Sequence, residues 1–169
     1  MINTGDAAFI LVCAAMVCFM TPALAIFYAG LLRKNNVIDI MTQSFIAIGV
    51  VTPLWMLCGF SLAFAPSVGG VIGNLQYAFL NGVGAEPNAG YAETIPFILF
   101  FGFQIMFAII TPALVSGTIA ERTTLKSYVL FLIFWSLLVY VPICHWVWGG
   151  GFLASLGLAD FAGGTVRCV

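Results

Sequence analysis

Charged residues are scarce in this sequence. Its 169 residues include five Lys or Arg, six Asp or Glu and one His, so charged residues make up 7% of the chain. A soluble domain carries about 25% charged residues, and so few charges cannot cover the surface of a soluble domain of this length. The formal net charge of −1 offers no basic face for nucleic acid. These scarcities exclude a soluble enzyme, a nucleic-acid-binding protein and a disordered chain.

Residues that build metal centres and catalytic sites are also scarce. His145 is the only histidine, so no second imidazole can complete a metal site or a proton relay. The five cysteines lack the paired spacing of zinc ligands, and most of them fall in apolar segments, where cysteine behaves as a small hydrophobic residue. GxSxG, HExxH and phosphate-loop motifs are absent from the sequence. We therefore expect no enzymatic activity, no metal site and no cofactor.

Long uncharged apolar runs dominate what is present. Hydrophobic residues make up 63% of the chain, and a membrane-spanning helix needs about 20 of them in succession. The uncharged run 40–85 is broken by proline and glycine from Pro66 onward, which predicts one helix followed by a long loop. We expect a single transmembrane domain over 1–169, an all-α polytopic bundle integral to the membrane. The expected spans are about 7–31, 39–64, 95–119 and 125–146, with the start of a fifth from about 161.

The few basic residues predict the orientation of these spans. Arg33 and Lys34 lie in the first expected loop, Arg122 and Lys126 lie in or next to the third, and the loop 66–94 contains two Glu and no base. Cytoplasmic loops carry the excess of Lys and Arg. The pattern predicts a multi-pass protein of the cell membrane with its N-terminus outside. The first apolar run lacks the basic start of a signal peptide, so we expect it to be retained.

Proline and small residues recur inside the expected spans. The tetrapeptide Thr-Pro-Ala-Leu stands at 21–24 and again at 111–114. A Thr hydroxyl beside a Pro kink is one physical explanation, and chance repetition is the other. Small residues four apart would allow two helices to approach closely. These pairs are Ala25 with Ala29 and Ala113 with Gly117.

The third expected span places an aromatic pair beside an amide. Phe103 and Phe107 are four residues apart, so they share one helix face. The pair is either a lipid-facing aromatic row or a hydrophobic constriction in a pore. Gln104 lies at the same depth, where its polar amide needs a hydrogen-bonding partner.

Residues at the end of the fourth span and after it carry candidate chemistry. Trp148 could present its ring to a cation, whereas Trp146 beside it is typical of membrane-interface anchoring. His145 is more typical of a hydrogen-bonded structural residue than of a catalytic one. Asp160 stands before small residues, which is typical of a helix N-cap. A carboxylate near the membrane also often marks a functional site, so the two interpretations of Asp160 overlap.

Four segments together resemble the ammonium transporter (Amt/Mep/Rh) family. They are Phe-Tyr-Ala-Gly-Leu-Leu-Arg-Lys-Asn at 27–35, Gly-Thr-Ile-Ala-Glu-Arg at 117–122, His-Trp-Val-Trp-Gly-Gly-Gly at 145–151 and Asp-Phe-Ala-Gly-Gly-Thr-Val at 160–166. The last of these is close to a signature of the family. The resemblance extends in register over residues 6–166, nearly the whole chain.

The resemblance implies a fold and a transport function. The family has eleven spanning helices, arranged as two inverted five-helix halves plus one, in a homotrimer with one pore per subunit. Trp148 and Phe107 would form an aromatic cage that recruits ammonium at the outer mouth. Phe103 and Phe107 would be two stacked gate rings, and Asp160 would organise the site without binding the ion. Neutral ammonia would then cross an apolar pore, and a PII-type regulator would be a possible cytoplasmic partner.

The C-terminal residues depart from the family pattern. After Val166 the family continues with an apolar residue and a pore histidine, whereas this chain has Arg167 and Cys168. We therefore expect a first-half chain of about five helices, truncated before the first pore histidine and incomplete for conduction on its own. The alternative is a non-transporting membrane fragment that associates with full-length trimers or modulates them.

Overall fold

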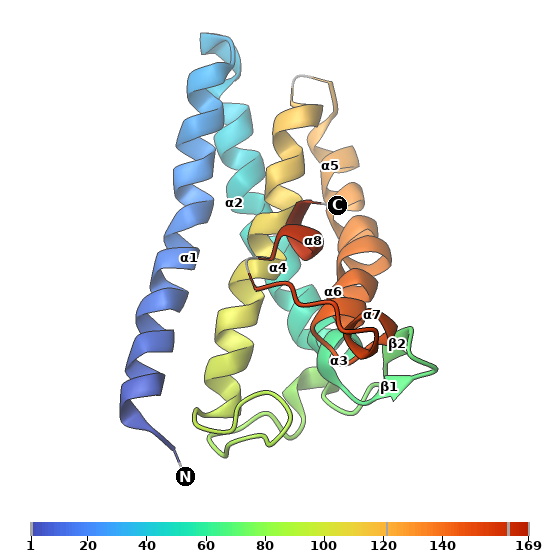
Figure 1. Ribbon diagram of the computed structural model, residues 1–169. Coiled ribbons are helices and arrows are strands. Elements are labelled where there is room, and N and C mark those ends of the chain that lie inside the picture. Colours follow the sequence, from blue (N-terminus) through green and yellow to red (C-terminus); the bar gives the residue numbers. More distant parts are fainter. Residues whose placement is uncertain (1, 121, 162, 169) are drawn as a thin grey trace.

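The computed structural model describes residues 2–120, 122–161 and 163–168. Four helical stretches run alternately up and down, and loops gather at one end of the bundle (Figure 1). Each stretch in the described part of the chain is long and apolar enough to cross a membrane. The predicted all-α membrane fold is therefore confirmed.

The first stretch is the single helix α1, Thr4–Leu31. The Asn3 side chain accepts hydrogen bonds from the backbone N–H groups of Gly5 and Asp6, and the Asp6 carboxylate in the first turn suits the positive end of the helix dipole. Because Asn3 provides this cap, the helix begins earlier than the expected residue 7. It continues through Pro22.

The second stretch combines three helical elements. After the short 3-10 turn η1, Lys34–Asn36, helix α2 covers Val37–Leu54, a π-helical turn η2 covers Trp55–Gly59, and α3 covers Phe60–Phe64. Together they occupy the expected span 39–64. The π turn was not predicted, because hydrophobicity along the sequence does not register one extra residue in a helical turn.

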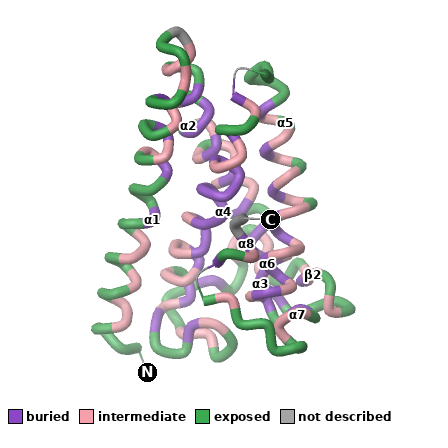
Figure 2. The backbone as a smooth tube through the Cα atoms, turned by 45° about the horizontal axis from the view of Figure 1, so that its top comes forward, coloured by how far each residue is buried: buried purple, intermediate pink, exposed green. Residues whose placement is uncertain are grey.

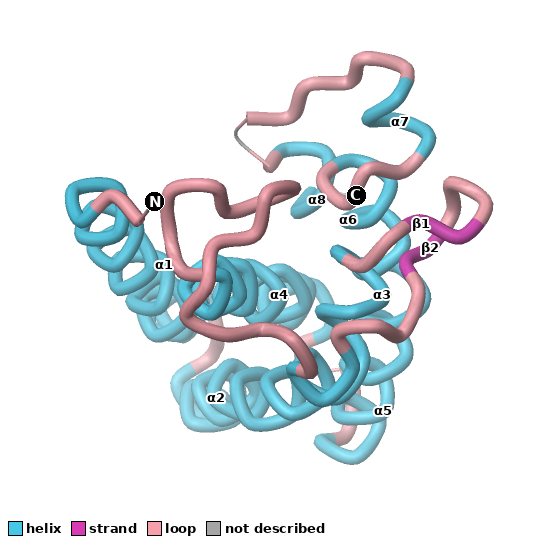
Figure 3. Tube along the Cα trace, turned by 90° about the horizontal axis from the view of Figure 1, so that it is seen from below, coloured by secondary structure: helices cyan, strands magenta, loops and turns pink. Residues whose placement is uncertain are grey.

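A loop of residues 65–96 follows, and it contains a small hairpin. Strand β1, Ser67–Val68, pairs antiparallel with β2, Ile72–Gly73, at the edge of the bundle (Figure 3). Gly69 and Gly70 have φ values of +64° and +77°, which the tight turn between the strands requires. Strands of two residues are too short to show an alternating pattern, so the sequence predicted only a loop. A 3-10 turn, η3, covers Ala78–Leu80.

The remaining helices complete the bundle. They are α4, Phe97–Ile119; α5, Leu125–Trp135; the π turn η4, Ser136–Tyr140; α6, Val141–Val147; α7, Phe152–Ser155; and α8, Gly164–Cys168. Helix α5, η4 and α6 follow one another without a break and form the fourth stretch. Helix α8 begins later than the expected residue 161, because the segment before it is held by Asp160, as described below.

Helix α4 is the centre of the bundle. It packs against both α1 and α2, and it is the most buried long helix, whereas α1 exposes most of its surface (Figure 2). A Cβ atom at Gly117 would lie 2.7 Å from the ring of Tyr28, whose hydroxyl donates to the Leu114 carbonyl at 3.0 Å. Gly117 therefore allows Tyr28 of α1 to approach α4 closely.

The loops divide by charge between the two ends of the bundle. The α1–α2 and α4–α5 connections lie at the same end of the bundle (Figure 1). The first connection contains Arg33 and Lys34, the second contains Arg122, and Lys126 lies in the first turn of α5. The N-terminus and the loop 65–96 lie at the other end. The bundle thus has one basic end and one end that is mostly apolar and acidic.

Candidate functional site

A cavity of about 540 Å³ lies between α4, the end of α6 and the segment 158–161. Its lining is almost entirely aromatic and aliphatic. All four site residues predicted from the sequence line it: Phe103, Phe107, Trp148 and Asp160. Residues far apart in the sequence are thus brought to one place.

Phe107 and Trp148 form the aromatic pair of the cavity. Their ring centroids are 6.3 Å apart and their planes meet at 67°. The Trp148 indole N–H donates to the backbone carbonyl of Asp160 at 3.0 Å, which fixes the orientation of the ring. Phe107 is buried, and Trp148 is half-buried against the cavity. Both rings line the same cavity, where they meet edge to face.

Phe103 and Phe107 meet edge to face. Their centroids are 4.8 Å apart and the interplanar angle is 83°, so the two rings pack against each other edge to face. An edge-to-face contact places the positive edge of one ring against the negative face of the other. Both rings line the cavity, which argues against the lipid-facing row considered from the sequence.

The carboxylate of Asp160 is occupied by the backbone. One oxygen accepts from the N–H groups of Gly163 and Gly164 at 2.8 and 3.1 Å, and the other accepts from Thr165 and Val166 at 3.0 and 3.4 Å. This pattern is that of a helix cap, although Asp160 stands ahead of the first residue of α8. The carboxylate therefore orders the segment whose carbonyl holds Trp148.

With this geometry established, comparison with known proteins decides the family. The family model described as Ammonium Transporter Family matches residues 8–168. This chain belongs to the ammonium transporter family. It is a multi-pass membrane protein of that family, which is a family of transporters rather than of enzymes.

Individual ammonium transporters match most of this chain. It is 47% identical over 162 residues to an ammonium transporter of Bacillus subtilis, covering 96% of this chain and 40% of that relative. It is 40% identical over 164 residues to ammonium transporter Amt1 of Archaeoglobus fulgidus, covering 97% and 39%. The crystal structure of Candida albicans Mep2 matches with a TM-score of 0.87 at 35% identity, covering 98% of this chain and 36% of that one. The chain thus spans about 40% of the length of the curated ammonium transporters it matches.

Three further residues line the cavity, and sequence reasoning did not select them. Phe64, Tyr91 and Phe100 pack together: Tyr91 stacks on Phe100 at 5.7 Å, and Phe64 meets Phe100 edge to face at 5.1 Å. Phe100 lies one turn before Phe103 and Gln104 on the same face of α4, so helical spacing could have found it. Tyr91 comes from the loop 65–96, where no periodic signal exists.

Tyr91 ties this loop to the turn after α6. Its hydroxyl donates to the backbone carbonyl of Gly149 at 3.0 Å. Burial is the largest of the influences that raise the pKa of Tyr91, followed by the neighbouring Tyr77 and Cys144. The phenol therefore remains protonated and keeps donating at neutral pH.

His145 has the hydrogen-bonded structural role expected from the sequence. The imidazole is fully buried, with Nδ1 2.8 Å from the Ala63 carbonyl oxygen and Nε2 2.9 Å from the Ser67 hydroxyl. The ring thus joins α6 to the end of α3 and to β1. Within the described residues no group of three potential metal ligands occurs.

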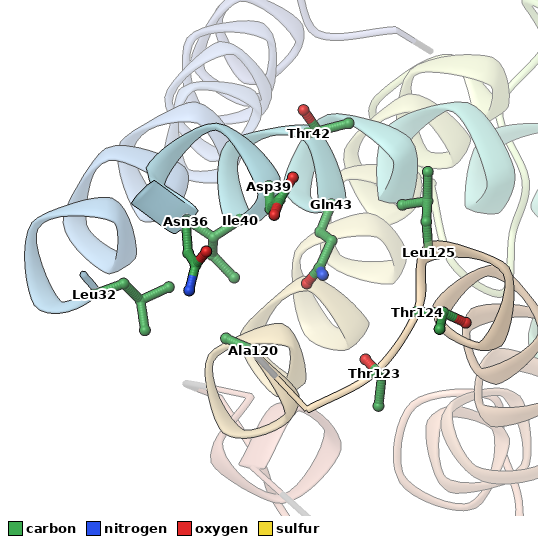
Figure 4. A pocket seen from close by; sticks show the side chains of 10 residues that line it. All are labelled: Leu32, Asn36, Asp39, Ile40, Thr42, Gln43, Ala120, Thr123, Thr124 and Leu125. Atoms are coloured by element: carbon green, nitrogen blue, oxygen red, sulfur yellow. The ribbon is translucent and has the colours of Figure 1, made fainter. Parts of the chain in front are cut away.

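A second cavity, of about 360 Å³, lies at the basic end of the bundle. Figure 4 shows Asn36, Asp39 and Gln43 of the second stretch facing Ala120 and Thr123 across it. None of the residues predicted for the site lies there. The expectation that Arg167 marks a departure from the family concerns a side chain outside the described part of the chain.

Proposed function

We propose that this chain is the ammonium-recruiting part of an ammonium transporter, and that the cavity between α4, α6 and the segment 158–161 is its outer recruitment site. The observation that carries the proposal is the pair of Phe107 and Trp148 rings at 6.3 Å, facing a cavity of about 540 Å³. Such a cage suits a small desolvated cation. The substrates are ammonium on the outer side and ammonia within the pore.

Two ring faces attract a cation through their quadrupoles. A cation within about 6 Å of a ring centroid gains roughly 0.5–2 kcal/mol, and tryptophan gives the largest gain. An ion seated in the cavity beside Phe107 and Trp148 could lie within that distance of both centroids. The aromatic and aliphatic side chains of the lining lower the local dielectric constant, which strengthens this attraction.

Below the cage, Phe103 and Phe107 act as the gate. The two rings meet edge to face in the cavity wall, and the segment 97–119 carries no charged side chain. A hydrated ion would lose its water there without compensation. Ammonium that gives its proton to water at the outer mouth can cross this segment as neutral ammonia, which avoids that cost.

Asp160 positions the cage rather than binding the ion. Both oxygens already accept backbone hydrogen bonds, so the carboxylate is poorly placed to serve as a direct ligand. Its negative charge nevertheless lies beside the cavity and favours a cation there.

The proposal also includes the orientation of the chain in the membrane and its assembly. The basic end carries Arg33, Lys34, Arg122 and Lys126 and faces the cytoplasm, so the N-terminus and the recruitment cavity face outward in the cell membrane. The functional unit is a homotrimer in the bilayer, with a PII-type protein as a possible cytoplasmic regulator. The exposed apolar surface of α1 is consistent with burial in lipid or against further subunits.

Tryptophan indole signals test the recruitment site. The chain has four tryptophans, so ¹⁵N-tryptophan labelling of the protein in lipid nanodiscs gives four indole N–H signals by NMR. We expect ammonium chloride to shift the Trp148 signal saturably and to leave those of Trp55, Trp135 and Trp146 unmoved. Sodium chloride at equal ionic strength is the control. Equal small shifts of all four signals would refute the proposed site.

A further inference from the structure

We propose that Gln104 determines specificity at the recruitment site: its amide oxygen accepts a hydrogen bond from the ammonium ion, which favours ammonium over potassium. The inference rests on the proposed recruitment function and adds a directional hydrogen-bond acceptor that the aromatic rings lack. Gln104 lies on α4 three residues before Phe107 and lines the same cavity.

The amide oxygen of Gln104 is buried and has no hydrogen-bond partner among the described residues. The side chain is only 8% exposed. Buried polar atoms are nearly always paired, because leaving one unpaired costs free energy. An unpaired amide at the wall of a cavity is therefore a site that an incoming hydrogen-bond donor would satisfy.

The other polar groups lining the cavity are already engaged. The Asp160 carboxylate accepts four backbone N–H groups, and the Asp160 carbonyl accepts the indole N–H of Trp148. The Tyr91 hydroxyl donates to Gly149. Among the described side chains that line the cavity, the Gln104 amide is thus the one whose acceptor is unused.

One acceptor discriminates between two cations of similar size and equal charge. Aromatic faces attract potassium and ammonium alike, since that attraction is electrostatic. Potassium needs a full shell of oxygens to replace its water, which a single amide cannot supply. Ammonium instead directs one N–H to the amide oxygen and others toward the ring faces. The terminal torsion of glutamine is broad and two-fold, so turning the oxygen toward the ion is easy.

Side-chain amide NMR observes this interaction directly. The sequence contains three glutamines, Gln43, Gln76 and Gln104, so glutamine-selective ¹⁵N side-chain labelling gives three amide signals. In nanodiscs, ammonium chloride is expected to shift the Gln104 amide together with the Trp148 indole. Potassium chloride should move the Gln104 amide much less, and neither salt should move the amides of Gln43 and Gln76.

A matched pair of variants measures how much Gln104 contributes to ammonium affinity. Gln104→Leu removes the acceptor and should weaken ammonium binding about tenfold while changing potassium binding little, as expected when a hydrogen bond to an ion is lost. Gln43→Leu is the control: Gln43 is 6% exposed and its Oε1 is also unpaired among the described residues, but it lines the cavity at the basic end. It should leave both affinities unchanged.

The possible results distinguish failure of the Gln104 proposal from failure of the proposed recruitment site. An ammonium shift at Trp148 with no shift at Gln104, or equal affinity in Gln104→Leu, would overturn the role of Gln104 and leave the recruitment site standing. Equal Gln104 shifts with potassium and ammonium would overturn its role in specificity. No saturable shift at either residue would overturn both proposals.

Discussion

Asp160 is a single acidic side chain whose hydrogen bonds hold the C-terminal segment together. Its carboxylate gathers four backbone N–H groups, and its carbonyl holds the Trp148 indole. Sequence reasoning left two roles open for it, a helix cap and a functional carboxylate. The geometry joins them, because the cap orders the segment that orients Trp148.

Removal of this carboxylate should weaken both the fold and the cage. We expect Asp160→Ala to lower the free energy of unfolding by roughly 1–3 kcal/mol, since several N–H groups lose their acceptor. Asp160→Asn retains one acceptor oxygen, so its free energy of unfolding should fall by less than that of Asp160→Ala. Thermal unfolding in detergent, together with the Trp148 indole signal, measures the effect. Asp39→Ala is the control because Asp39 is exposed, and a loss as large as that of Asp160→Ala would contradict this account.

Tyr91 gives a prediction for alkaline pH. Burial raises its pKa above the ordinary 10.0, so the folded state favours the neutral phenol. The stability that Tyr91 contributes is therefore complete below pH 10 and is lost as pH rises toward the folded-state pKa. At neutral pH Tyr91→Phe should cost about 1 kcal/mol through loss of the bond to Gly149. The difference between wild type and Tyr91→Phe should shrink above pH 10 in unfolding measurements, and a constant difference would argue against it.

At the scale of elements, the contact between α3 and α6 depends on a glycine. A Cβ atom at Gly149 would collide with the Ala63 carbonyl and lie 2.6 Å from Nδ1 of His145. The His145 bond that links these two helices passes through the same space. No side chain fits there without separating α3 from the turn that carries Trp148.

Gly149→Ala should therefore destabilise the protein by about 1–3 kcal/mol, the range for overpacking a tight contact. Gly49→Ala in α2 is the matched control, because a Cβ there meets nothing within 4 Å and alanine favours a helix by about 1 kcal/mol. Thermal unfolding of both variants in detergent tests the contact. Equal stability of the two variants would show that the collision is relieved at no cost.

Some of the helices and strands could be predicted from sequence patterns and others could not. Apolar runs bounded by charge or glycine predicted the helical fold, because lipid requires long helices with satisfied backbones. The π turns at Trp55–Gly59 and Ser136–Tyr140 and the hairpin of β1 and β2 escaped prediction, since none of them changes the hydrophobic pattern. Residue chemistry made Phe107, Trp148 and Asp160 candidates and the resemblance supplied their roles, whereas the unpaired amide oxygen of Gln104 is apparent only in the folded chain.

On the scale of the whole molecule, the segregation of basic loops predicts one orientation. We expect a membrane-impermeant maleimide to label Asn81→Cys, in the loop 65–96, in intact cells. Thr123→Cys, in the α4–α5 connection, should be labelled only after the membrane is permeabilised. The parent chain, with its native cysteines, provides the background. The opposite labelling pattern would place the N-terminus and the aromatic cavity on the cytoplasmic side.

The central claim is that the aromatic cavity binds ammonium-like cations, and equilibrium binding of radiolabelled methylammonium to the chain in nanodiscs tests it most directly. The account predicts saturable binding, displaced by ammonium and weakened about tenfold or more in Trp148→Leu. Trp146→Leu, whose indole bonds Val71 outside the cavity, should bind as wild type does. Binding that is absent, or that is the same in wild type and Trp148→Leu, would contradict the account.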